Sequence, residues 1–200
     1  MQGRPDRIRH VDRKERIETW IAWATHMLCG GVVLGMILAA AQPLITDDLW
    51  LHLGLGRIYA ASGPILTTDP FLHTASSPPE AHGWLADVFL HEIARWTGFT
   101  GLRVLHASIV IVFLGLAWWI VRRETRSSMA ASLAVATLTL LAAYRLVQLR
   151  PQLFSMVAVL VLYACFLSKS ASIRAWKLAA IAAFAAVWAN VHPAFLLAPI

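Results

Sequence analysis

Two adjacent aspartates and a histidine one helical turn later offer the first candidate chemistry. Asp47 and Asp48 directly follow an apolar stretch, and His52 lies four residues after Asp48. A carboxylate at a water boundary suits a general base or a ligand of a divalent cation. At this spacing on a helix, His52 can share a metal ion with Asp48 or donate a hydrogen bond to it. The alternative is that one aspartate caps the start of a helix.

Arg145 and Arg150 lie between two apolar stretches. A cation in such a place is costly unless it faces water, a carboxylate or a phosphate. The guanidinium group is a planar fork that matches the oxygens of a phosphate. The sequence therefore predicts that one or both arginines bind the phosphate of a lipid, with snorkelling toward lipid headgroups as the alternative.

Five further polar residues are candidates for the same site: Asp69, His82, His91, Asn190 and His192. Asp69 precedes a proline, so it is also explained by turn chemistry. Asn190 and His192 follow an apolar stretch and either complete a polar site or satisfy exposed backbone groups. The histidine spacing fits no compact zinc pattern, so a divalent cation on Asp48 and His52 is the one cofactor that these residues suggest.

The elements that position these residues are long apolar blocks. The chain is 58% hydrophobic and only 14% charged, which is too apolar for a soluble domain of this length. Blocks of this kind are typical of bilayer spans. We expect spans at about residues 24–41, 102–121, 129–144, 153–167 and 176–191, with a sixth beginning near Ala194. The fold class is thus all-α, a polytopic transmembrane helical bundle, and the chain resembles the N-terminal part of a longer protein.

The basic residues predict the orientation of these spans. Twelve of the 17 lysines and arginines fall in three segments, at residues 1–19, 122–128 and 168–177, which lie on one side of the expected topology. Positive charge collects on the cytoplasmic side of membrane proteins. We therefore expect a cytoplasmic N-terminal segment, a first span within residues 20–41, an extracytoplasmic loop over 42–101 and the other spans in 102–200. The basic segment then contacts anionic lipid headgroups, and a nucleic-acid partner is not expected.

The expected loop contains two amphipathic helices, at about residues 48–61 and 84–96. The first places Asp48 and His52 on one face, and the second places Asp87, His91 and Arg95 on one face. Each helix has an apolar face as well, which is typical of helices that lie at a membrane interface.

Several segments resemble those of a known family. Residues 48–57, D-L-W-L-H-L-G-L-G-R, resemble the D-x-W-W-H-L-x-x-G-R segment of bacterial multi-spanning membrane proteins similar to glycosyltransferases of the C superfamily. Residues 67–71 (T-T-D-P-F), 82–85 (H-G-W-L), 150–155 (R-P-Q-L-F-S) and 188–192 (W-A-N-V-H) resemble further segments of that family in the same order. Leu51, Gly83 and Pro193 depart from the pattern, with Gly83 in place of a glutamate.

The resemblance implies an activity and a location. It implies an inverting glycosyltransferase of the bacterial inner membrane that takes its sugar from a polyprenyl-phosphate donor at the outer face. Asp48 or Asp47 would then be the base or a metal ligand, and Arg150 would stabilise the departing lipid phosphate. The alternative is a non-catalytic membrane subunit whose external helices dock a protein partner.

The topology is tested by labelling single cysteines from outside intact cells. With Cys29 and Cys165 replaced by alanine, an impermeant reagent should label Ser76→Cys and leave Thr125→Cys unlabelled, because position 125 lies in a basic, cytoplasmic segment. Labelling at position 125 and protection at position 76 would reverse the orientation.

Overall fold

A computed structural model of the chain describes residues 5–40, 47–78, 81–126, 128–142, 148–167 and 175–194, and these residues contain helices and no strand. The helices are α1 (Pro5–Ala40), α2 (Asp47–Ser62), α3 (Trp84–Thr125), α4 (Met129–Ala142), α5 (Pro151–Leu162) and α6 (Ala175–Ala189). A π-helical turn, Tyr163–Leu167, continues α5. The all-helical expectation is confirmed over the described residues.

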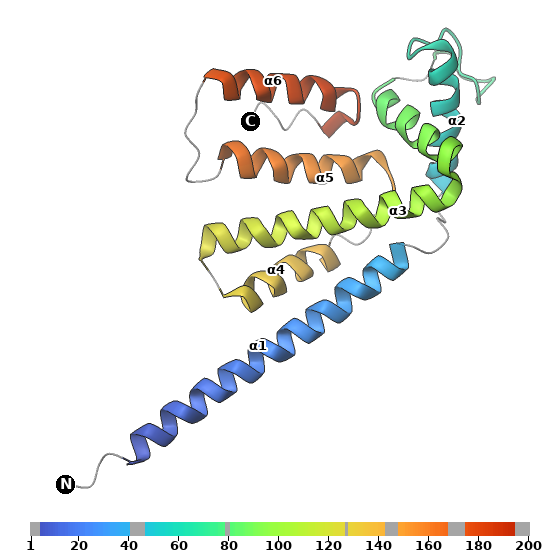
Figure 1. Cartoon of the computed structure of the whole chain (residues 1–200). Helices are drawn as coiled ribbons and strands as arrows, with labels where there is room; N and C mark the ends of the chain where they lie inside the picture. The colour runs from blue at the N-terminus through green and yellow to red at the C-terminus, as the bar shows by residue number, and fades with distance from the viewer. Residues whose placement is uncertain are drawn as a thin grey trace.

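The helices stack side by side around α3 (Figure 1). On one side of α3 lie α4 and then α1, and on the other side lie α5 and then α6. Helix α2 packs against the first part of α3 at one end of this stack, where α5 begins and α6 ends. This end, formed by α2, the first part of α3, residues 148–151 and residues 190–194, is called the α2 end below.

The helices lie at the positions of the expected spans, with one difference at the N-terminus. Helix α1 starts at Pro5, well before the expected start of the span near Ala24, so the basic segment is continuous with it. The reason is local, because proline is favoured in the first turn of a helix and no other proline occurs before residue 43. The segments at 143–147 and after Ala194, including the expected sixth span, lie outside the described residues.

Helix α3 consists of two helical segments that meet at a kink, as the sequence predicted. The expected interfacial helix 84–96 lies before Gly98 and the expected span 102–121 lies after it, within Trp84–Thr125. Gly98 has φ 66° and ψ −165°, a backbone conformation that is essentially restricted to glycine. The kink turns the first part of α3 toward α2 (Figure 1).

Three apolar clusters hold the helices together. The largest joins α3, α4 and α5 through residues such as Phe113, Ala136 and Leu153. A second, at the α2 end, joins four leucines with exposed fractions of 1% or less: Leu49, Leu90, Leu102 and Leu149. A third joins α5 and α6 around Trp188, whose Nε1–H donates a hydrogen bond of 2.8 Å to Ser155 Oγ.

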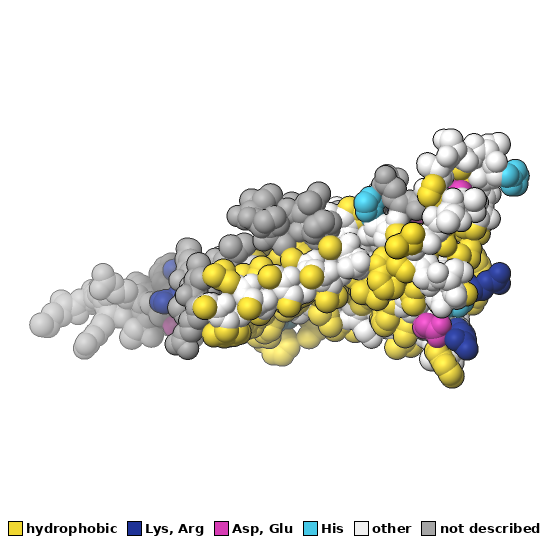
Figure 2. Space-filling view, turned by 90° about the horizontal axis from the view of Figure 1, so that it is seen from above, with side chains coloured by type: hydrophobic (Ala, Val, Ile, Leu, Met, Phe, Trp, Pro, Cys, Tyr) yellow, Lys and Arg dark blue, Asp and Glu magenta, His cyan; other side chains and the backbone are white. Residues whose placement is uncertain are grey.

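Two of the described helical segments, Arg13–Gly35 in α1 and Trp84–Thr125, are long and apolar enough to cross a membrane. Shorter apolar helical segments are Met129–Thr139, Pro151–Phe166 and Ala175–Ala189. Figure 2 shows apolar side chains along one face of the stack, with charged and histidine side chains gathered toward the α2 end of that face.

The kink at Gly98 leads to a prediction about stability. Gly98→Ala should lower the free energy of unfolding by about 1–3 kcal/mol, because a Cβ disfavours the backbone conformation at this position. Thermal unfolding followed by circular dichroism in detergent measures the loss. Gly115→Ala is the matched control, since Gly115 lies within α3 with no atom near its would-be Cβ, and it should leave stability unchanged or raise it. Equal stability of the two variants would contradict the prediction.

Candidate functional site at the α2 end of the bundle

Asp48 and Arg150 form an ion pair between α2 and the start of α5. The Arg150 Nη2 atom lies 2.9 Å from Asp48 Oδ2, and the two side chains are 33% and 49% exposed. Arg150 immediately precedes Pro151, which favours the extended backbone observed there (φ −139°, ψ 161°). Asp48 and Arg150 are about 100 residues apart in the sequence and were both candidates for one polar site, and the structure brings them together.

The Arg150 side chain keeps hydrogen-bonding capacity beyond this pair. Its Nε atom is buried and has no hydrogen-bond partner among the described residues. A guanidinium carries five N–H donors. The pair uses one of these donors, and the side chain is 33% exposed, so a further anionic group can reach part of the guanidinium.

His52 pairs with Asp87 and not with Asp48. The His52 Nδ1 atom lies 2.7 Å from Asp87 Oδ1, joining α2 to the first part of α3. The Asp87 side chain is only 6% exposed, and that of His52 is 23% exposed. The expected bond between His52 and Asp48 is therefore wrong, because the face of α2 that carries both residues packs against α3, which brings Asp87 to the imidazole.

Gly56, one turn after His52, allows this close approach. A Cβ at this position would overlap the backbone carbonyl of Asp87 and lie 2.8 Å from the Cβ of His91. Only glycine lets the two helix backbones come so near. His91 thus borders the contact between α2 and α3, one turn after Asp87.

The chain after α6 closes the other side of the α2 end. Asn190 Oδ1 accepts a hydrogen bond of 2.7 Å from Trp84 Nε1, and the Asn190 carbonyl accepts one of 3.0 Å from the Leu85 amide. These bonds place His192, two residues later, within electrostatic reach of His52. Burial first, and the nearby His52 second, lower the pKa of His192 below its ordinary value.

Tyr59 is a buried residue of α2 that lies near two carboxylates. The residue is 4% exposed. Burial, followed by the carboxylates of Asp87 and Asp69, raises the pKa of its phenol above the ordinary value. Sequence reasoning placed Asp87 on the same face as His91 but did not include it in the site. Asp87 lies 35 residues after His52, a spacing that matches no local pattern, so the sequence alone does not predict that the two residues pair.

The remaining expected site residues are Asp69, His82, Arg145 and Asp47. Asp69 Oδ1 accepts hydrogen bonds from the amides of Phe71 and Leu72, at 2.8 and 2.9 Å, so it shapes a turn. His82 is exposed in the chain before α3. Arg145 and the side chain of Asp47 lie outside the described residues.

The described residues contain no group of three or more histidine, cysteine, aspartate or glutamate side chains placed to hold a metal ion. Asp48 and His52, the two expected metal ligands, instead contact Arg150 and Asp87. The geometry of the described residues therefore gives no support to a divalent cation at this position.

An apolar pocket lies beside the polar residues. It has a volume of about 370 Å³ and is lined by Leu85, Ala86, Phe89, Phe154 and Val191. The Phe89 and Phe154 rings meet edge to face with their centroids 6.0 Å apart. Phe154 follows Arg150 by one helical turn, and Val191 adjoins His192. The α2 end thus combines a cation, a histidine–carboxylate pair and an apolar surface.

Comparison of the chain with models of known protein families, with curated proteins and with solved structures finds no match.

The lowered pKa of His192 predicts a pH dependence of stability. In the unfolded chain the pKa of His192 is about 6.5, which is higher than in the folded chain. As the pH falls through this value, the unfolded chain therefore binds more protons than the folded chain. Stability should therefore fall as the pH drops from about 7.5 to about 5.5. His192→Asn should reduce this fall, measured as the change in Tm in detergent, whereas His73→Asn, at an exposed position, should retain it. An unchanged fall in His192→Asn would refute the assignment.

Proposed function

We propose that this chain belongs to a polytopic membrane enzyme that transfers a sugar from a polyprenyl-phosphate donor to a hydroxyl-bearing acceptor. The α2 end faces the extracytoplasmic side of a bacterial inner membrane in this proposal. The observation that carries it is the Asp48–Arg150 pair, a partly exposed cation with unused donors beside an apolar pocket.

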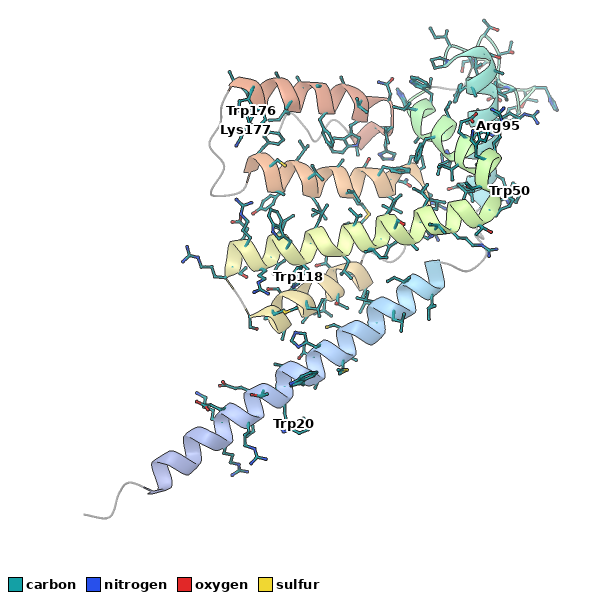
Figure 3. All side chains as sticks on the ribbon, in the orientation of Figure 1. Trp20, Trp50, Arg95, Trp118, Trp176 and Lys177 are labelled. Carbon is teal, nitrogen blue, oxygen red and sulfur yellow. The ribbon has the colours of Figure 1, made fainter. Side chains whose placement is uncertain are left out.

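The distribution of side chains supports a membrane location. Large apolar side chains of α1 are exposed, including Trp20, Trp23, Met27, Leu28 and Leu34, and lipid would cover them. Trp50 lies at the α2 end, while Trp118 and Trp176 lie toward the opposite end (Figure 3). Tryptophans near both ends of a stack are typical of the two interfaces of a bilayer.

The opposite end of the stack also carries basic residues. Arg122 and Arg123, in the last turn of α3, lie over the rings of Trp118 and Trp119 at 5.7 and 5.1 Å from the ring centroids. The start of α1 points toward the same end (Figure 1). Positive charge at that end supports a cytoplasmic assignment for it and an extracytoplasmic assignment for the α2 end.

The site supports recognition of a lipid phosphate in two parts. Arg150 offers charge-assisted hydrogen bonds to phosphate oxygens, and Asp48 holds the guanidinium in place until the anion arrives. The apolar pocket, with Phe154 one turn from Arg150, offers a surface for the first carbons of the lipid chain. One element, the start of α5, thus contributes to both parts.

The proposed reaction is a direct displacement. An oxygen lone pair of the acceptor hydroxyl forms a bond to the anomeric carbon, while the bond from that carbon to the phosphate oxygen breaks and its electron pair leaves with the phosphate. A side chain of the site takes the hydroxyl proton. Arg150 stabilises the charge that develops on the leaving phosphate, and attack from the opposite face inverts the anomeric centre.

Binding of polyprenyl monophosphate to the full chain in lipid nanodiscs tests this function. Arg150→Ala should weaken binding by about 10- to 100-fold, because hydrogen bonds to a charged group contribute about 1.5–3 kcal/mol. Arg95→Ala, which removes an exposed arginine paired with Glu92, is the matched control and should bind normally. Native mass spectrometry measures the bound fraction. A wild-type chain that binds no polyprenyl phosphate would favour the docking-subunit hypothesis instead.

A further inference from the structure

The His52–Asp87 bond fixes which nitrogen of the histidine is available for chemistry. An ionised carboxylate only accepts hydrogen bonds, so at 2.7 Å from Asp87 Oδ1 the Nδ1 atom of His52 carries the hydrogen. In the neutral imidazole the other nitrogen, Nε2, then has a free lone pair. The side chain is 23% exposed, so part of it is accessible from outside the helix contact.

Asp48 is less suited to accept a proton. Its Oδ2 atom already accepts from Arg150 at 2.9 Å, and the same guanidinium is the proposed phosphate ligand. Asp48 therefore serves to position Arg150, which binds the leaving phosphate in this proposal. The two carboxylates of the α2 end therefore have different partners, one a cation and the other a histidine.

We propose that His52 Nε2, and not Asp48, accepts the proton of the acceptor hydroxyl, with Asp87 as the positioning residue of His52. This inference rests on the proposed function. The acceptor oxygen gives its proton to Nε2 as its lone pair bonds the anomeric carbon, and the phosphate departs with the electrons of the broken bond. Asp87 fixes the tautomer and stabilises the imidazolium that forms.

Close packing of α2 against α3 brings His52 and Asp87 together. Gly56 permits the approach, and its replacement by a residue with a Cβ would collide with the backbone of Asp87 itself. Burial of Asp87 makes the bond to His52 important for stability, since an unpaired buried carboxylate is costly.

Other titratable or charged groups surround His52. Asp48 lies one turn earlier on α2 and Tyr59 lies two turns later, while α3 supplies Asp87 and His91. His192 interacts electrostatically with His52, and Arg150 is paired with Asp48. A pH profile of transfer therefore reports the whole group, and the tautomer of His52 is the more specific measurement.

The tautomer is measured by nitrogen NMR of the full chain labelled with ¹⁵N-histidine in detergent micelles, with the His52 signals assigned from their loss in His52→Gln. At neutral pH the wild type should show His52 with hydrogen on Nδ1. Asp87→Asn should shift the population toward hydrogen on Nε2, because the amide can donate to Nδ1. Glu92→Gln, on the same helix, should change nothing. A wild-type His52 with hydrogen on Nε2 overturns the proposal even if Asp87→Asn fails to fold.

Transfer is measured as release of polyprenyl phosphate from a set of polyprenyl-phosphate-linked hexoses and pentoses. His52→Gln should reduce the rate by about 100-fold or more, and Asp87→Asn by about 10- to 100-fold. The double variant should be no slower than His52→Gln, because both changes affect one unit. Binding of polyprenyl monophosphate should be unchanged in both, and His73→Gln should be fully active.

The two measurements separate failure of this inference from failure of the proposed function. A wild type that transfers sugar and a His52→Gln variant that is equally active would overturn the role of His52 and leave the function intact. A wild type that transfers no sugar from any donor of the set would reject the function, and with it the catalytic role of His52, whatever the tautomer.

Discussion

The arrangement of the site depends on the burial of four leucines at the α2 end. Leu49 adjoins Asp48, Leu149 adjoins Arg150, and Leu90 follows Asp87 by three residues, so each polar residue is placed by a buried neighbour. Burial of a leucine contributes about 1.5–3 kcal/mol. The Asp48–Arg150 pair contributes about 0–1 kcal/mol, because both side chains reach solvent. The apolar cluster therefore brings the charges together, and the ion pair is a consequence of it.

Two glycines give this cluster the geometry that it needs. Gly98 kinks α3 so that its first part turns toward α2, and Leu102, the fourth leucine of the cluster, lies just beyond the kink. Gly56 then allows the two backbones to approach closely. A straight α3 or a side chain at position 56 would leave the same residues on the same helices without the His52–Asp87 contact. The positions of the helix backbones, set by these two glycines, are what bring the polar residues of the site together.

The sequence predicted the parts of the fold that depend on local patterns. Helix α2 was expected at about 48–61 and runs over Asp47–Ser62, and it ends before Gly63, whose φ is 81°. Asp48 and Arg150 were both expected on the extracytoplasmic side, Asp48 just after the first apolar block and Arg150 between the third and the fourth, and they meet in the structure. The partner of His52 was not predicted from the sequence. Asp48, four residues earlier on the same helix, was the expected partner, but a residue on the facing helix, Asp87, lies closer to the ring. Only the packing direction of α2, which no local pattern encodes, selects Asp87.

Burial of its carboxylate distinguishes the His52–Asp87 pair from the Asp48–Arg150 pair. Asp87 is buried, and its charge, together with burial, raises the pKa of the neighbouring Tyr59 phenol. The Asp87 carboxylate contacts the His52 ring directly, at 2.7 Å from Nδ1. In the proposed mechanism, a proton that moves to His52 gives this buried carboxylate a cationic partner. At Asp48 the corresponding cation, Arg150, is present from the start, so protonation there would weaken a favourable pair. The two carboxylates thus differ in their partners, an arginine for Asp48 and a histidine for Asp87, and in the proposed mechanism only the second pair gains a proton.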